Sequence, residues 1–399
     1  MDDARYYTGE NNMVLKVMQK SVSGRFVIGF CKIATIVLAF VSSFVLTSCA
    51  GPAVMKGAGS VTKLAEALSE SQSVEPFMGD WGGSWRLGDG SQSGGLVAQV
   101  IALGKGKYRA NLLDVFDQRV PPIAVFEGEL QGGKLPFVGR AEYEGAKLQV
   151  LAVIEAGKFT GDFKGQTAEG DDVSGTLELE KTVRLSPTLG AKPPAGAIVL
   201  FDGKNFDQWE RIGTSGGKAD KKEVRWKLLP GGAMEVAPGG GSIVTKKKFT
   251  DFNLHIEFRT PFMPDARGQG RGNSGVYLQG RYEIQVLDSY GLEGLDNECG
   301  GLYTIAAPRV NMCALPMQWQ TYDITFRAPR FDSAGAKLSD ALLTVVHNGV
   351  KIHDKIKVPG PTGGALDGNV SQPGGIYLQD HGNPVQFRNI WLVELKLKT

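Results

Sequence analysis

Apolar and polar residues alternate along most of this chain in short runs that end at glycine, asparagine or aspartate. In residues 252–259 every second side chain is apolar, so His255, Glu257 and Arg259 fall together on the opposite face of an extended strand. No segment shows sustained helical periodicity, and the pattern is typical of β-strands joined by tight turns. We therefore predict an all-β protein.

The predicted strands fall into two groups, separated by a stretch rich in proline, glycine and alanine at 186–196. The first group comprises 79–86, 96–103, 108–116, 125–130, 147–154 and 173–179. The second group comprises 252–259, 275–279, 282–287, 321–327, 342–346 and 376–380, with a hairpin turn at Asn348-Gly349. These groups predict a small β-barrel or β-sandwich at 76–185 and a jelly-roll sandwich at 197–399, joined by a stiff linker.

Residues 1–48 have the features of a secretion signal. An apolar stretch at 33–46 follows basic residues and leads into Leu-Thr-Ser-Cys, which resembles the lipobox of bacterial lipoproteins. A retained membrane anchor is the alternative, but the apolar stretch is shorter than the roughly 17–25 residues that span a bilayer. We expect Cys49 to carry the lipid and residues 49–75 to form a tether. No aspartate follows Cys49, so the resemblance favours the outer membrane, facing the periplasm.

Charge and cysteine content exclude several classes of protein. The formal net charge of the 399 residues is +2, and removal of residues 1–48 leaves 39 basic and 39 acidic side chains. This balance argues against nucleic-acid binding and leaves lipid attachment as the means of membrane association. The four cysteines form no zinc-binding pattern. Only Cys299 and Cys313 remain after processing, and either a disulfide or two free thiols is compatible with the sequence.

Two further strands place polar side chains at alternate positions. Glu283 and Gln285 share one face of their strand, and Tyr377, Gln379 and His381 share one side of theirs. Together with the polar face of residues 252–259, these carboxylate, amide, phenol and imidazole groups suit a cleft that binds sugar hydroxyls and ring faces. The alternative is an ordinary solvated sheet face. We expect a single polar cleft with a carbohydrate as its ligand.

The spacing Glu283-x-Gln285-x-x-Asp288 matches the Glu-x-Asp-x-x-Glu motif of laminarinase-type retaining β-glucanases. Those enzymes need two carboxyl groups about 5–5.5 Å apart, one as nucleophile and one as acid. Here the middle position is an amide, which cannot ionise, and the last acid is shorter. Conventional retaining hydrolysis is therefore disfavoured.

A series of motifs in the second half of the chain resembles one known family. In chain order they are Leu200-Phe201-Asp202-Gly203-Lys204 with Trp209, 252–259, Gly272-Asn273-Ser274-Gly275-Val276-Tyr277, 282–288, Cys299-Gly300-Gly301-Leu302-Tyr303, 319–323, 376–382 and 385–390. Together they resemble the 3-keto-disaccharide hydrolase domain family, which has a concanavalin-like jelly roll related to the laminarinase scaffold. The resemblance covers residues 197–399 and leaves 76–185 without an assigned role.

The resemblance implies cleavage of glycosides that are already oxidised at C3 of the sugar. A ketone at C3 acidifies the C2 proton, so a base can form an enolate that expels the group at C1, after which water adds to the enone. Candidate base, acid or hard-metal ligands are Glu257, Glu283, Asp288 and His381. Candidate substrate-binding residues are Arg259, Asn273, Gln285, Tyr303, Tyr377 and Gln379. A divalent metal would suit enolate stabilisation, but no ligand spacing requires one.

Two other functions remain open at this stage. One is a carbohydrate-binding module without turnover, because sandwiches of this type are often lectins and fold does not decide function. The other is a conventional β-glucanase, which the amide at Gln285 disfavours. The sequence indicates neither the sugar nor its aglycone, and it does not indicate the oligomeric state.

Overall fold

The computed structural model describes residues 75–212 and 223–396. The predicted signal sequence, the tether up to residue 74 and Cys49 lie outside this range. The described residues contain strands and one short 3-10 turn, η1 (Gly268–Gly270), but no α-helix, which confirms the all-β prediction. In this part of the chain no helical segment has the length and apolar character needed to cross a bilayer.

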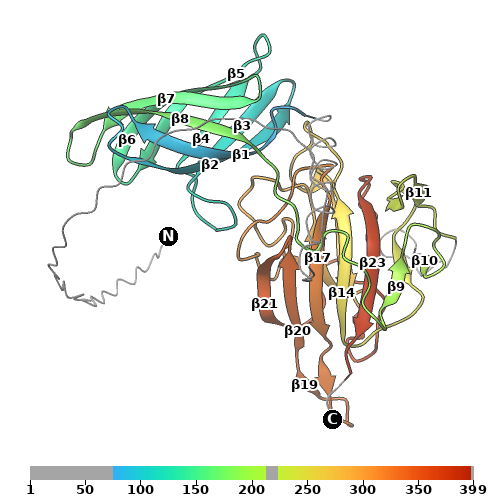
Figure 1. Ribbon diagram of the computed structural model, residues 1–399. Coiled ribbons are helices and arrows are strands. Elements are labelled where there is room, and N and C mark those ends of the chain that lie inside the picture. The colour runs from blue at the N-terminus through green and yellow to red at the C-terminus, as the bar shows by residue number, and fades with distance from the viewer. Residues whose placement is uncertain (1–74, 213–222, 397–399) are drawn as a thin grey trace, which may run out of the picture. The chain divides into compact units, whose positions relative to one another are not determined.

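The first group of strands forms a nearly closed barrel (Figure 1). Its strands are β1 (Gly79–Leu87), β2 (Ser93–Gly104), β3 (Lys107–Leu113), β4 (Ala124–Glu129), β5 (Leu135–Tyr143), β6 (Ala146–Glu155), β7 (Lys158–Gln166) and β8 (Asp172–Thr182). All neighbours are antiparallel, in the order β4-β3-β2-β1-β8-β7-β6-β5. The two end strands meet where Gly139 of β5 packs directly on the ring of Phe126 of β4. Of the two architectures predicted for this domain, a barrel or a sandwich, the structure therefore has the barrel.

Two barrel strands, β5 and β7, were not expected from the sequence. Glycines and a proline interrupt their apolar alternation, at Pro136 and Gly139 in β5 and at Gly161 and Gly165 in β7. These residues lower intrinsic strand propensity, so the local pattern is weak. Pairing overrides that local weakness: β5 pairs with β6, and β7 pairs with both β6 and β8.

The second group of strands forms a two-sheet sandwich. Its strands are β9 (Ile198–Phe201), β10 (Trp209–Arg211), β11 (Lys227–Leu229), β12 (Ala233–Glu235), β13 (Ile243–Thr245), β14 (Phe252–Arg259), β15 (Ser274–Leu278), β16 (Tyr282–Val286), β17 (Gln320–Arg327), β18 (Arg330–Phe331), β19 (Lys337–Ser339), β20 (Ala341–His347), β21 (Val350–Val358), β22 (Tyr377–Leu378) and β23 (Gln386–Glu394). The smaller sheet has the order β10-β13-β22-β15-β16. The larger has the order β11-β12-β23-β14-β17-β20-β21, with β9 on β23 and a separate β18–β19 ribbon.

The sandwich core lies between these sheets and is built from alternate positions of their strands. Ile256 and Phe258 of β14 and Ile284 of β16 are fully buried in it. Tyr282 of the smaller sheet contacts Phe326 of the larger one, with ring centroids 5.3 Å apart. The predicted hairpin at 348–349 joins β20 to β21, and both turn residues have positive φ, as a type I′ turn requires.

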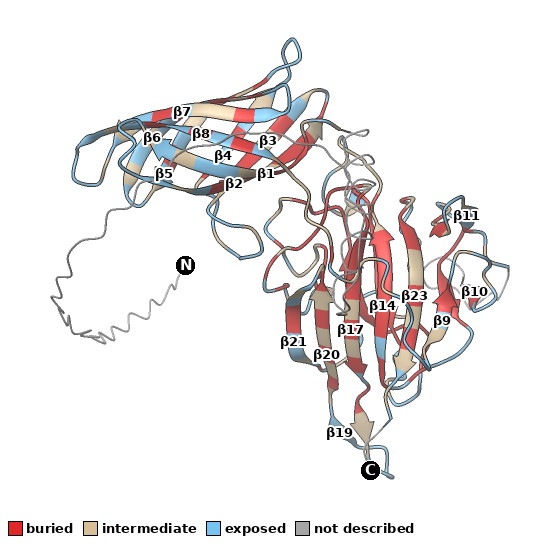
Figure 2. Ribbon diagram, viewed as in Figure 1, coloured by how far each residue is buried: buried red, intermediate tan, exposed pale blue. Residues whose placement is uncertain are grey.

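The outer face of the larger sheet is covered by the segment that precedes the sandwich. Residues 186–191, called the strap here, run along β14, β17 and β23. Thr188 donates a 2.6 Å hydrogen bond to Asp323, and the backbone N–H of Gly190 donates to Glu257. The amide of Asn389 donates to the carbonyl of Ala191. The predicted linker is thus hydrogen-bonded to the sheet in its first half, and Figure 2 shows β14 buried over most of its length.

Beneath the strap lies a charged cluster. Burial alone lowers the pKa of His255, but hydrogen bonds to Asp323 and Glu257 outweigh it and raise the pKa to about 9. Burial would raise the pKa of Glu257, yet His255, Asn389 and Arg388 outweigh it and hold the pKa at about 2. Each charge therefore has an opposite partner, and His255 also stacks on Trp391 at 4.9 Å. The cluster ties strap to sheet through paired charges.

This cluster predicts a pH-dependent stability. The folded-state pKa of His255 lies above its usual value of 6.5, so its stabilisation is complete below pH 6.5 and is lost as pH rises through about 9. We expect a loss on the order of 3 kcal/mol in the free energy of unfolding across that window. Urea unfolding at successive pH values measures it, with His255→Asn as the variant that lacks the dependence.

The matched control is His381→Asn, because His381 is exposed and lies outside the cluster. This variant should keep the wild-type slope of unfolding free energy against pH. An equally steep slope in His255→Asn would show that another group produces the dependence.

Candidate functional site

The outer face of the smaller sheet carries a buried carboxyl group next to two tyrosines. Glu283 of β16 lies opposite Tyr277 of β15, which lies opposite Tyr377 of β22. The Tyr277 hydroxyl donates a 2.7 Å hydrogen bond to Glu283 Oε2, and the two tyrosine rings are 4.6 Å apart. These side chains share a face because each alternates with core residues such as Val276, as strand geometry requires.

Glu283 has no cationic partner among the described residues. Its side chain is 2% exposed, and burial raises its pKa to about 8, partly offset by the hydrogen bond from Tyr277. Burial and the nearby carboxyl group also raise the pKa of Tyr277, which keeps the phenol protonated as a donor. A carboxyl group with such a pKa can exchange a proton near neutral pH, which is the property expected of a general acid or base.

Two glycines create the space for this pair. A side chain at Gly275 would come within 2.3 Å of Glu283 Oε1. A side chain at Gly364 would come within 2.5 Å of the Tyr277 hydroxyl, and Gly364 also has a φ of +74°. Both positions admit only glycine without displacement of the catalytic candidate or its partner.

The segment 359–375 covers this face and closes over the carboxyl group. The Thr362 hydroxyl accepts a 2.9 Å hydrogen bond from the Glu283 backbone, and Thr362 in turn bonds the carbonyl of Arg281. The carbonyl of Gly363 lies 3.2 Å from the Tyr277 hydroxyl, as a second and more distant acceptor for its one O–H. Arg281 holds the far end of the segment through Asp367, at 2.6 Å. Because Glu283 is 2% exposed beneath these contacts, its carboxyl group is enclosed by the protein.

Beside Glu283, three side-chain amides form a connected network. Gln285 Nε2 donates to Gln269 Oε1 at 2.9 Å, and Asn273 Nδ2 donates to the same oxygen at 3.1 Å. Gln269 Nε2 donates to the carbonyl of Asn297 at 2.7 Å. Asn273 Oδ1 is buried without a hydrogen-bond partner among the described residues. The network fixes the chain around 269–273 against β16, so Gln285 braces the site.

A second polar group lies on the other side of the tyrosines. The Tyr377 hydroxyl donates to Ser242 Oγ at 3.1 Å, and the same oxygen accepts the backbone N–H of Asp380. Gln379 Nε2 donates to the Tyr277 hydroxyl at 3.2 Å. Gln379 and Asp380 are only half-buried, so this side is the more accessible approach to the carboxyl group.

The structure brings six of the ten predicted catalytic and substrate-binding residues together. Those gathered around the smaller sheet's outer face are Glu283, Gln285, Asn273, Tyr377 and Gln379, together with Tyr303, whose backbone N–H donates to the carbonyl of Glu283 and whose ring faces Gly363. His381 is exposed in the turn after β22.

Glu257 and Arg259 do not join this group. They lie on the outer face of the larger sheet, so the sandwich core separates them from Glu283. Glu257 is engaged under the strap, and Arg259 bonds Gln386 and lies over the Trp319 ring at 4.7 Å. The expectation of a single polar cleft is wrong for these two residues, because β14 and β16 belong to different sheets. The alternation of apolar and polar residues does not show to which sheet a strand belongs.

Asp288 is also engaged elsewhere. It lies past the end of β16, is 1% exposed, and forms a 2.7 Å ion pair with Arg271. Burial raises its pKa, against the opposing effect of Arg271. Cys299 and Cys313 are both buried free thiols in this structure, so of the two alternatives left by the sequence the described state is the unbridged one.

Tyr277 is the main residue that sequence reasoning missed. It stands in the family motif at 272–277 but was not named as a site residue. Its position between apolar Val276 and Leu278 gives the same alternation signal that identified Glu283. Ser242 and Thr362 sit in irregular segments and Gln269 sits in the three-residue turn η1, so none of them lies in a periodic pattern. No group of three or more His, Cys, Asp or Glu side chains within 75–212 and 223–396 is arranged to hold a metal ion. The described residues thus offer no preformed site for the divalent metal considered above.

A β-sandwich with a carboxyl group, tyrosines and amides on one outer face has the groups that a carbohydrate-active domain needs for sugar hydroxyls and ring faces. Residues 196–393 match the profile of the 3-keto-alpha-glucoside-1,2-lyase-like domain family. The chain belongs to this family, which confirms the resemblance drawn from its motifs.

Solved structures of similar proteins include two candidate glycosyl hydrolases from Parabacteroides distasonis. One is 37% identical, with 51% of this chain and 85% of that chain covered and a TM-score of 0.45. The other is 20% identical, with 50% and 95% covered and a TM-score of 0.37. A search of curated proteins finds no match to this chain.

The glycine at 364 provides a test of the enclosed geometry. Gly364→Ala would strain the backbone and push on the Tyr277 hydroxyl, so we expect it to lower the free energy of unfolding by about 1–3 kcal/mol. Gly368→Ala is the matched control in the same segment, because a side chain there would meet no atom within 4 Å. Urea unfolding compares the two, and equal stabilities would mean that Gly364 does not pack on Tyr277.

Proposed function

We propose that this chain is an exported enzyme that cleaves 3-keto-glycosides by removing the C2 proton and expelling the group at C1. The observation that carries the proposal is the buried, cation-free carboxyl group of Glu283, hydrogen-bonded to Tyr277. Family membership supports the same conclusion, because the family is described by a 1,2-lyase activity on 3-keto-α-glucosides. Whether water then adds to the enone determines a hydrolase or a lyase outcome.

In this proposal Glu283 is the base. A C2 proton next to a ketone is weakly acidic, so a carboxylate whose pKa is about 8 accepts it more readily than an ordinary carboxylate would. Tyr277 holds the carboxylate in place by donating its one O–H to Oε2. Once Glu283 has taken the C2 proton and is neutral, that O–H is released and can turn to the developing negative charge. Gln379, bonded to the Tyr277 hydroxyl, positions that phenol.

Substrate must reach a carboxyl group that is 2% exposed. We propose that segment 359–375 moves away from β16 when the sugar enters and closes again around it. Thr362 and Gly363 are the residues whose bonds to Glu283 and Tyr277 would break. Closure would exclude water from the enolate, which strengthens the hydrogen bonds that stabilise it.

The contacts of Glu283 disfavour a conventional β-glucanase. That mechanism requires a second carboxyl group about 5–5.5 Å away. The neighbouring acid of the motif, Asp288, is instead paired with Arg271, and the direct partner of the Glu283 carboxyl group is a tyrosine. A binding module without turnover remains as an outcome that the first experiment below distinguishes.

The base assignment predicts a specific pH profile. With a 3-keto-disaccharide such as 3-keto-trehalose, kcat/KM should rise about tenfold per pH unit below pH 8 and level off above it, because only ionised Glu283 accepts the proton. Glu283→Gln should reduce kcat/KM by at least about a hundredfold, within the usual range for loss of a general base. Mass spectrometry of the released sugar measures both.

The control is Glu257→Gln, an isosteric change at a carboxyl group on the other sheet. It should retain most activity, although it weakens the strap. If kcat/KM falls as pH rises through 8, Glu283 acts as the acid instead. Measurable binding of 3-keto-disaccharides without cleavage would favour a carbohydrate-binding module without turnover. Cleavage of the unoxidised disaccharide would contradict the proposed substrate class.

We also propose that the protein is a lipoprotein held at the outer membrane through Cys49. The lipobox-like sequence at 46–49 and the short apolar stretch before it support this location. Palmitate labelling should mark the wild-type protein and not Cys49→Ala, and the variant should leave the membrane fraction. Equal membrane retention of an unlabelled variant would contradict the lipid anchor.

A further inference from the structure

The two ends of the barrel are filled differently. At one end Trp81, Phe137 and Phe159 pack against one another, with ring centroids 5.7 and 5.9 Å apart, and all three are at most 1% exposed. At the other end the barrel is hollow, with a cavity of about 380 Å³. The same strands line both ends, so the difference comes from the side chains they direct inward.

Small residues create the hollow. Ala141 of β5 and Ala146 of β6 occupy inward positions, and Ala168 lies in the turn above. Around them, inward-facing apolar side chains remain partly exposed to solvent: Trp85, Leu87, Ile123, Leu148 and Val173. Barrels of eight strands are just wide enough to be filled by side chains or to hold one small ligand. Here the apolar wall is not filled by side chains.

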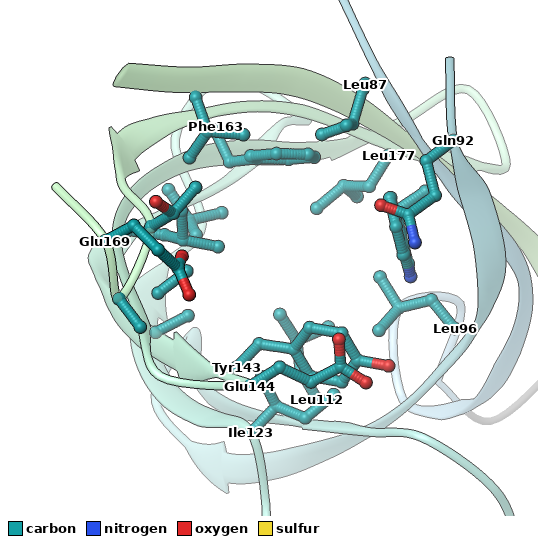
Figure 3. A pocket seen from close by; sticks show the side chains of 18 residues that line it. Leu87, Gln92, Leu96, Leu112, Ile123, Tyr143, Glu144, Phe163, Glu169 and Leu177 are labelled. Carbon is teal, nitrogen blue, oxygen red and sulfur yellow. The ribbon is translucent and has the colours of Figure 1, made fainter. Parts of the chain in front are cut away.

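The mouth of the cavity is polar and acidic. Figure 3 shows Gln92, Tyr143, Glu144 and Glu169 around the opening, with apolar side chains such as Leu96 and Leu177 on the wall. No lysine, arginine or histidine lines this cavity. Carboxylates at the mouth repel an anionic head group, whereas they accept hydrogen bonds from a hydroxyl.

We propose that this cavity is a binding site for a small, uncharged amphiphile: an apolar chain or ring body with a hydroxyl head group. The body lies against Trp85, Leu148 and Phe163, and the hydroxyl group lies at the mouth, where Glu144 and Glu169 accept its hydrogen bond. The volume of about 380 Å³ corresponds to about a dozen water molecules at ~30 Å³ each, or an organic molecule of similar heavy-atom count. The site is independent of Glu283 and of the proposed cleavage reaction.

The test uses a matched pair of probes, 1-octanol and octanoate, which share an alkyl chain length and differ in the charge of the head group. Isothermal titration calorimetry of the whole chain in detergent-free buffer should show one site for 1-octanol. At an ionic strength of about 0.01 M, where the Debye length is about 30 Å, octanoate should bind at least about fivefold more weakly. The double change Glu144→Gln with Glu169→Gln should reduce this discrimination to less than about twofold.

A second pair of variants places the site inside the barrel. Ala146→Phe fills the cavity from β6 and should weaken 1-octanol binding at least about tenfold. Leu151→Phe, on the outward face of the same strand, is the control and should bind as the wild type does. Because Ala146→Phe could disturb folding, the fluorescence of Trp85 gives an independent measurement: 1-octanol should shift the emission of the wild type and not of Trp85→Phe.

Each outcome decides the proposal. Saturable 1-octanol binding that is lost in Ala146→Phe and kept in Leu151→Phe supports it. Absence of 1-octanol binding, or binding that Ala146→Phe leaves unchanged, overturns the site. Octanoate binding as tight as that of 1-octanol in the wild type overturns the uncharged ligand class.

Discussion

Burial of ionisable side chains on both outer faces of the sandwich is the constraint on which the rest of this structure depends. An antiparallel sheet commonly leaves its outer face to water. Here the strap covers one outer face and segment 359–375 covers the other. A polar group beneath these covers is stabilised by a hydrogen-bond partner within the protein, because an unpaired buried group costs about 1–3 kcal/mol. The hydrogen bonds from the Gly190 N–H to Glu257 and from the Glu283 N–H to the Thr362 hydroxyl are two such partnerships.

Two buried glutamates show how differently the requirement can be met. Glu257 accepts hydrogen bonds from Asn389 and Arg388 and lies beside protonated His255, so its pKa falls to about 2 and it is a fixed negative charge. Burial raises the pKa of Glu283 to about 8, because only the hydrogen bond from Tyr277 opposes it, so the charge of Glu283 can change near neutral pH. Both residues are almost completely buried in the same sandwich. The difference lies in their partners, and it separates a structural carboxylate from one suited to proton transfer.

Much of the fold could be predicted from the sequence, because period-two alternation is a local property. The strand at 252–259 has the same bounds in the structure, and the hairpin at 348–349 is where the turn residues indicated. Strands β5 and β7 were not predictable in this way, because their glycines weaken the local pattern and pairing with β6 compensates. The family motifs added what alternation lacks, namely the identity of the second domain.

The site was only partly predictable, for a related reason. Alternation shows which side chains point away from the core, and it correctly gave Glu283 and Gln285 a common face. It does not show to which sheet a strand belongs, so it could not separate Glu257 from Glu283. Nor does it show what covers an outer face, since the covers are irregular segments held by single bonds such as that from Glu283 to Thr362.

The barrel interior shows a similar limit of the sequence pattern. Alternation indicates which side chains point inward, but it does not indicate how much of the interior they fill. Inward positions recur at every second residue of β1 and β5, whatever the size of the side chain that occupies them. At one end those positions hold Trp81 and Phe137, and the interior is solid; towards the other they include Ala141, and an apolar wall remains uncovered. Apolar surface left accessible inside a barrel loses the stabilisation that burial would provide, at about 25 cal/mol per Å². A protein that retains such a wall forgoes stability there, which is the usual mark of a surface kept for a ligand.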